Sequence, residues 1–166
     1  MATTLEKFDS AGGFSVEKTT VIDELRNAKD INTLEIKNSN FTDSSASSYI
    51  LRGLNTSTLD LDGTGGQIPI ANSTMSFITG NIIGVNSVGT VYAVKFETAL
   101  YCDGSGNTSV LSSFQTVIKD DIPQGETWDV QPLGALNRFS YDTTRAGTTS
   151  TIKWVAFTEV ISIDWT

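Results

Sequence analysis

Two long stretches with a strict two-residue period constrain the fold of this chain more than any other feature of its sequence. From residue 74 to 85 and from 91 to 101, most of the large apolar side chains stand at alternate positions. Successive side chains of a β-strand point to opposite faces, so this period predicts two long strands. In the second, we predict that one face carries Tyr92, Val94, Phe96, Thr98 and Leu100.

The same pattern continues to the end of the chain. Further strands are predicted at 109–118, 127–133, 136–142 and 150–163, with turns at 86–89, 103–107 and 120–126. Ser and Thr make up about a quarter of the chain, which suits short turns and paired strands. With no helical period between the strands, we expect an all-β fold, an antiparallel β-sandwich or jelly roll with an extended N-terminal arm.

The predicted last strand is apolar on both faces, which is expected when one face packs in a core and the other meets a neighbouring chain. We therefore predict a homo-oligomer, such as a trimer. The residues predicted to form its subunit interface are Val155, Phe157, Ile161 and Ile163.

The beginning of the chain has a different pattern. Its apolar residues are irregularly spaced among charges, and a polar, turn-rich segment follows at 38–48. We predict an N-terminal attachment arm and linker over 1–45, including a short strand at 34–36, and a β-sandwich domain over 46–166. The residues predicted to attach the arm to a larger particle are Phe14, Val16, Val21, Ile22 and Leu25.

Composition argues against several classes of partner. The net charge is −8 and no cluster of Lys and Arg stands free of acidic residues, so we expect no nucleic-acid partner. No apolar run reaches the ~18 residues of a membrane span, and the first residues do not resemble a secretion leader, so we expect neither membrane insertion nor a cleaved leader. The single cysteine, Cys102, is predicted to be a small buried hydrophobe.

The chain has no histidine, which excludes Ser-His-Asp and Cys-His catalysis and imidazole-bound zinc. A pair of carboxylates remains a possible catalytic device, as in glycosidases. The acidic candidates lie on separate predicted strands and turns, and nothing in the sequence shows two of them converging. We therefore expect no enzymatic activity and no catalytic residue; the acidic candidates are Glu97, Asp103, Glu126, Asp129 and Glu159.

Two glycine-rich segments resemble the opening of a calcium-binding loop. Asp60 and Asp62 fit the D-x-D-G start but lack the later bidentate Glu, and 103–107 resembles it more weakly. Turns are the favoured interpretation of both segments, and whether Asp60 and Asp62 bind calcium stays open. We expect no cofactor and no metal-binding residue.

Two parts of the sequence resemble structural proteins of tailed bacteriophages, especially those of marine cyanobacteria. Residues 12–36, GGFSVEKTTVIDELRNAKDINTLEI, are similar to a lead that recurs in such virion proteins. The later segments resemble a β-sandwich of head-fibre, tail-fibre and capsid-decoration proteins. The segments that carry this second resemblance are FITGNIIGV, VYAVKFETALYCDGSGNTSVL and TIKWVAFTEVISI.

The resemblance implies a virion component, assembled in the host cytoplasm, whose partners are other capsid or tail proteins. Since there is no shaft repeat, a capsid-decorating or short fibre-like subunit is favoured over a long fibre. An alternative is a receptor- or glycan-binding module at a fibre tip that contacts a host surface glycan or receptor. The candidate contacts are Trp165, Tyr141 and the loops at 103–107 and 142–149.

Overall fold

A computed structural model describes residues 14–16, 19–22, 28, 31 and 33–166. The chain divides into two compact units, Met1–Asn32 and Thr33–Thr166. In the first unit, β1 (Phe14–Val16) pairs antiparallel with β2 (Thr19–Ile22), and Phe14 stands opposite Ile22. Of the residues predicted to attach the arm, Leu25 lies outside the described residues.

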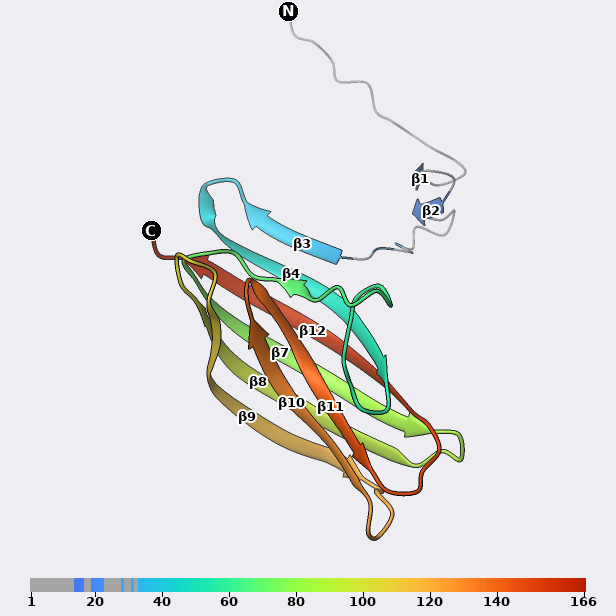
Figure 1. Cartoon of the computed structure of the whole chain (residues 1–166). Coiled ribbons are helices and arrows are strands. Elements are labelled where there is room, and N and C mark those ends of the chain that lie inside the picture. The colour runs from blue at the N-terminus through green and yellow to red at the C-terminus, as the bar shows by residue number, and fades with distance from the viewer. Residues whose placement is uncertain (1–13, 17–18, 23–27, 29–30, 32) are drawn as a thin grey trace, which may run out of the picture. The chain divides into compact units, whose positions relative to one another are not determined.

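The second unit is built on a sheet of six antiparallel strands in the order β3-β4-β12-β7-β8-β9 (Figure 1). Most of these strands are long, and sequence neighbours β7, β8 and β9 are also neighbours in the sheet. Their bounds are β3 Thr33–Asn38, β4 Phe41–Leu54, β7 Thr74–Asn86, β8 Val91–Cys102, β9 Thr108–Asp120 and β12 Ile152–Asp164.

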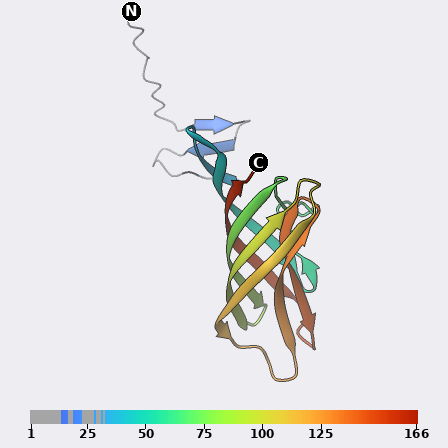
Figure 2. The ribbon, with the colours of Figure 1, turned by 90° about the vertical axis from the view of Figure 1, so that its left-hand side faces the viewer.

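A smaller sheet covers one face of the large one, as the side view in Figure 2 shows. It consists of β10 (Thr127–Ala135) and β11 (Arg138–Ala146), with the two-residue strands β5 (Ser57–Thr58) and β6 (Ile68–Pro69) paired to β11. The two layers form an antiparallel β-sandwich, which confirms the fold class predicted from the sequence. Among the described residues, none forms a helix of the length and apolarity that crossing a membrane requires.

The core lies between the two sheets and is rich in aromatic rings. Phe96 of the large sheet lies 5.9 Å from Tyr141 of the small one, and Trp154 lies 6.3 Å from Trp128, centroid to centroid. All four rings are almost completely buried. Large buried aromatic rings contribute much of the stability of a core this thin.

Glycines on β7 make room for two of these rings. A Cβ atom at Gly80 would overlap the hydroxyl of Tyr141, and one at Gly84 would overlap the indole of Trp154. Both glycines lie on the inner face of the strand, Gly80 beneath a ring of the small sheet and Gly84 beneath the ring of its paired residue on β12, and both positions require a missing side chain. The glycines of FITGNIIGV therefore serve packing.

The polar segment 38–48 differs from its prediction as a linker. From Phe41 onward it is strand β4, and the pairing of this strand with β12 runs from Ser44 opposite Ile163 to Leu54 opposite Lys153. The predicted strand at 34–36 is confirmed as part of β3, which pairs with β4 in turn. Serine can occupy a strand when a neighbouring strand supplies hydrogen bonds, and β12 does so here. The serine-rich composition was therefore misleading.

Candidate functional site

The face of the six-stranded sheet that points away from the small sheet is here called the outer face. In the described residues no other element of the chain's second unit covers it, and large apolar side chains lie along it. The exposed fractions are 56% for Ile50, 49% for Phe77, 47% for Ile83, 38% for Val155, 43% for Phe157, 59% for Ile161 and 53% for Ile163. We call these seven residues the β12 patch, since they lie on β12 and its neighbours β4 and β7.

Strand register explains why these residues gather. Ile161 stands opposite Phe77 on one side, and Phe157 stands opposite Ile50 on the other. Val155 likewise faces Ile83. Directly opposed side chains on one face of a sheet lie about 5 Å apart, so these pairs touch. All four residues predicted for a subunit interface belong to this patch.

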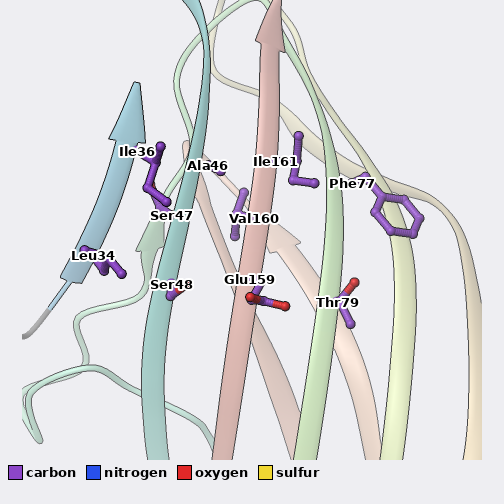
Figure 3. Close-up of a pocket in the computed structure, with 10 residues that line it drawn as sticks. All are labelled: Leu34, Ile36, Ala46, Ser47, Ser48, Phe77, Thr79, Glu159, Val160 and Ile161. Atoms are coloured by element: carbon purple, nitrogen blue, oxygen red, sulfur yellow. The ribbon is translucent and has the colours of Figure 1, made fainter. Parts of the chain in front are cut away.

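A shallow groove runs along the patch beside the edge strand β3 (Figure 3). Leu34 and Ile36 of β3, both more than half exposed, form one wall. Ile161 of β12 and Phe77 of β7 form the other, and the carboxylate of Glu159 lies on the groove as well. The groove is thus mostly apolar with one acid.

A polar lane crosses the outer face. Glu159 of β12, Thr79 of β7 and Glu97 of β8 occupy one row of paired residues. Strands are spaced about 4.8 Å apart, so the Cα atoms of the two glutamates lie about 10 Å apart. Lys95 forms an ion pair of 2.8 Å with Glu97. Sequence reasoning missed this row, because only the register of three strands creates it.

The other acidic candidates are engaged by their own surroundings. Both oxygens of Glu126 accept hydrogen bonds, from the amides of Thr148 at 3.2 Å and Thr149 at 2.9 Å and from the Trp128 indole at 3.1 Å. Together with the Thr149 hydroxyl, which has the largest effect, these donors lower the pKa of Glu126 to about 2. Glu126 thereby ties the start of β10 to the loop before β12.

The aspartates of both turn segments accept hydrogen bonds from amides of their own turn, Asp103 from those of Ser105 and Asn107. Asp60 Oδ1 accepts a hydrogen bond from the amide of Gly63, and Asp62 Oδ1 accepts from those of Thr64 and Gly66. The Thr64 amide is the main reason that the pKa of Asp62 lies below its usual value. Within the described part of the chain, no three His, Cys, Asp or Glu residues come together in a way that holds a metal ion.

The remaining candidates are divided by burial. Tyr141 is fully buried in the core and burial raises its pKa, so its prediction as a glycan contact is wrong. Most of the predicted loop 142–149 is strand β11. Trp165, in contrast, is 45% exposed and stacks on Tyr101 with ring centroids 5.0 Å apart and planes 3° from parallel.

Comparison with known proteins gives one structural likeness. No protein-family model matches the chain, and no curated protein matches it. Among solved structures, the tailspike protein gp49 of the Acinetobacter baumannii bacteriophage Fri1, a capsular polysaccharide depolymerase, matches with a TM-score of 0.48 and 14% identity. The match covers 90% of this chain and 22% of the tailspike chain, so this chain spans about a fifth of that protein.

The expectation of no enzymatic activity is contradicted by this comparison, because the tailspike it finds is an enzyme. That expectation rested on the missing histidine and on the lack of converging acids. Cleavage of a glycosidic bond needs only two carboxylates, and the register places Glu97 and Glu159 in one row. The missing histidine therefore does not exclude catalysis.

Proposed function

We propose that this chain is a structural subunit of a tailed-phage virion, a capsid-decorating or short fibre-like protein that assembles with copies of itself and with other virion proteins. The uncovered β12 patch is the observation that carries the proposal. Monomeric proteins rarely expose apolar patches above about 300–600 Å². A partner surface covers this apolar face in the assembled protein. Val155, Phe157, Ile161 and Ile163 take part in the contact between the subunits.

The size of the outer face suits a subunit contact. Six strands about 4.8 Å apart, with about ten residues each at about 3.3 Å per residue, cover about 24 by 33 Å, or about 800 Å². A specific protein–protein interface of standard size buries about 800 Å² on each partner. The phage assignment itself rests on the sequence resemblance of residues 12–36 and of the later segments.

Sedimentation of the full chain tests self-assembly. We expect a discrete oligomer, such as a trimer, at concentrations near 10 µM. A chain that sediments as a monomer up to several hundred µM would contradict the proposal.

The attachment role of the first unit is tested on assembled particles. In the full chain, Val21→Asp combined with Leu25→Asp is expected to abolish incorporation into phage particles, because two charges replace apolar contacts with a partner. Leu136→Asp is the matched control. Leu136 lies in the turn between β10 and β11 and is 66% exposed, so this variant should incorporate normally. Deleting residues 1–45 is a poor test, since it removes β3 and the start of β4 from the sheet.

A second candidate function, binding of a host surface glycan, is favoured by the exposed Trp165–Tyr101 stack. Flat aromatic rings offer an apolar surface with a polar tip. On an array of capsular polysaccharides, Trp165→Ala should lose binding that Leu136→Ala keeps. Release of shortened saccharides would reveal cleavage, and Glu97→Gln and Glu159→Gln would then show whether the polar lane performs it.

A further inference from the structure

Strand β9, the edge of the large sheet opposite β3, carries exposed apolar side chains on both of its faces: Phe114 stands opposite the outward-facing Glu97, and Val117 stands opposite the buried Val94. Leu111 is 57% exposed, Phe114 66%, Val117 50% and Ile118 66%. We call these four residues the β9 edge. Because β9 is the last strand of the sheet, its outward backbone edge has no partner strand within the described residues. A long apolar edge strand is a site where another chain adds or packs.

Two bulges give the β9 edge its shape. Leu100 pairs with Val110 and Ala99 with Ser112, so Leu111 between them has no partner on β8. In the same way, the pairing passes over Ile118. An extra residue in one strand bends it and redirects its side chain. Both bulge residues are large, apolar and exposed, which is unusual for bulges that serve to blunt an edge.

The β9 edge and the β12 patch are separate surfaces. Strand β8 lies between them, and from residue 93 to 99 its outer side chains are small or charged: Ala93, Lys95, Glu97 and Ala99. Since the two surfaces lie on different sides of this strip, a contact that covers one does not by itself cover the other. Each copy of the chain therefore presents two apolar surfaces.

The two surfaces match in height along the strands. Leu111 is next to Ser112 in the chain. Ser112 pairs with Ala99, Ala99 with Phe77 and Phe77 with Ile161, so these residues form one row across the sheet. Ile118 is next to Lys119, which belongs to a second row that runs through Ala93 and Ile83 to Val155. Rotating one copy of the chain about an axis parallel to the strands leaves the position of every residue along that axis unchanged. Such a rotation brings apolar residues of one copy against apolar residues of the next.

Charges at one end of the strands match as well. Asp121, just after β9, lies beside Val91, and the row of Val91 leads across β7 to Lys153 on β12. Asp121 is exposed and forms an ion pair of 2.7 Å with Lys119 of β9. The same rotation would bring this acid of one copy near Lys153 of the next. Opposite charges at a contact favour the correct register.

We propose that copies of this chain associate head to tail into a closed ring, in which the β9 edge of each copy packs on the β12 patch of the next. This inference rests on the proposed self-assembly and specifies its contact. A two-fold contact between two β12 patches would leave both β9 edges exposed, and a contact between two β9 edges would leave both patches exposed. One head-to-tail contact, repeated around a ring, covers both surfaces on every copy.

Two complementary variants of the full chain test this contact by native mass spectrometry and sedimentation. Ile118→Glu spoils only the β9 edge and Ile161→Glu only the β12 patch. Each is expected to be monomeric alone, with association weakened at least about 100-fold, because a charge would be buried without a partner. Mixed together, they should form a one-to-one heterodimer and stop there, since one intact edge meets one intact patch.

Leu136→Glu, on the turn between β10 and β11 and part of neither surface, should assemble like the wild type, and circular dichroism should show the same fold for all variants. If Ile118→Glu alone assembles like the wild type, the copies meet patch to patch and the ring is wrong while self-assembly stands. If the mixture stays monomeric although the wild type assembles, the head-to-tail contact is equally wrong. If the wild type is itself monomeric, the proposed function also fails.

Discussion

On strand β12, Trp154 and Val160 face the small sheet and are at most 5% exposed, whereas Phe157 and Ile161 alternate with them and are 43% and 59% exposed. The two faces of the same strand carry similar apolar side chains, and within the described residues of the second unit only the inner face has a covering layer. The inner face stabilises the folded chain. The outer face, with nothing described above it, is available for association. A strand's composition therefore says that a face is apolar, and the second sheet decides whether that face is core or contact surface.

The largest contrast is expected between Trp154→Ala and Phe157→Ala. Removing the buried indole leaves a cavity and should lower the free energy of unfolding by about 3–5 kcal/mol. Truncating the half-exposed ring of Phe157 should lower the free energy of unfolding of the monomer by less than about 1 kcal/mol. Urea unfolding at concentrations that keep both variants monomeric measures the difference. Equal losses of unfolding free energy would mean that the inner and outer faces of β12 contribute equally to the stability of the monomer.

Gly80 tests how tightly the covering layer packs on the inner face. Gly80→Ala puts a methyl group where the Tyr141 hydroxyl lies and should cost about 1–3 kcal/mol of folding free energy. Gly104→Ala is the control, because a Cβ there meets only the Ser73 hydroxyl, at an ordinary 3.6 Å. If thermal unfolding shows the two variants to be equally stable, the layers are more loosely packed than described.

Acid should weaken the tie that holds the small sheet's β10 to the loop before β12. The pKa of Glu126 is lowered from 4.5 to about 2 in the folded chain. A carboxylate with a depressed pKa stabilises the fold fully above its unfolded value, and this contribution is lost as pH falls from about 4.5 through about 2.

Melting temperatures across this pH range should therefore fall more steeply for the wild type than for Glu126→Gln, which has no carboxylate to protonate. Thr149→Val, which removes the donor with the largest effect, should flatten the profile in part. Parallel profiles for wild type and Glu126→Gln would show that the tie contributes nothing.

The smallest effect is expected on the outer face itself. Ile83→Ser removes an apolar side chain that is 47% exposed, and the free energy of unfolding of the monomer should change by no more than about 0.5 kcal/mol. Chemical unfolding of dilute protein measures this. A loss above 2 kcal/mol would place this residue in the core of the monomer.

Several features of the fold follow from local pattern alone. The strands at 74–85, 91–101 and 150–163 were predicted because the two-residue period is long there. The structure confirms that the alternate residues from Tyr92 to Leu100 share one face, and that face is buried. The turn at 103–107 was predicted from its Gly and Asn residues, which tolerate the positive φ found at Gly106. In these segments local propensity and tertiary structure agree.

Other features depend on which segments meet. The serines from 44 to 48 look like a linker, and they form a strand only because β12 and β3 pair on either side of them. Tyr141 resembles an exposed contact residue in the sequence, yet the six-stranded sheet buries it. Glu97 and Glu159 are 62 positions apart in the numbering, and only the order of β8, β7 and β12 brings them into one row.

The sequence by itself determined that this chain is an antiparallel all-β protein and that its last strand is apolar on both faces, because strand period and turn composition are local properties. Only the tertiary structure decided which face is covered, where the β12 patch and the β9 edge lie, and which carboxylates share a row. Those depend on strand order, bulges and register, which are set by contacts between residues far apart in the chain.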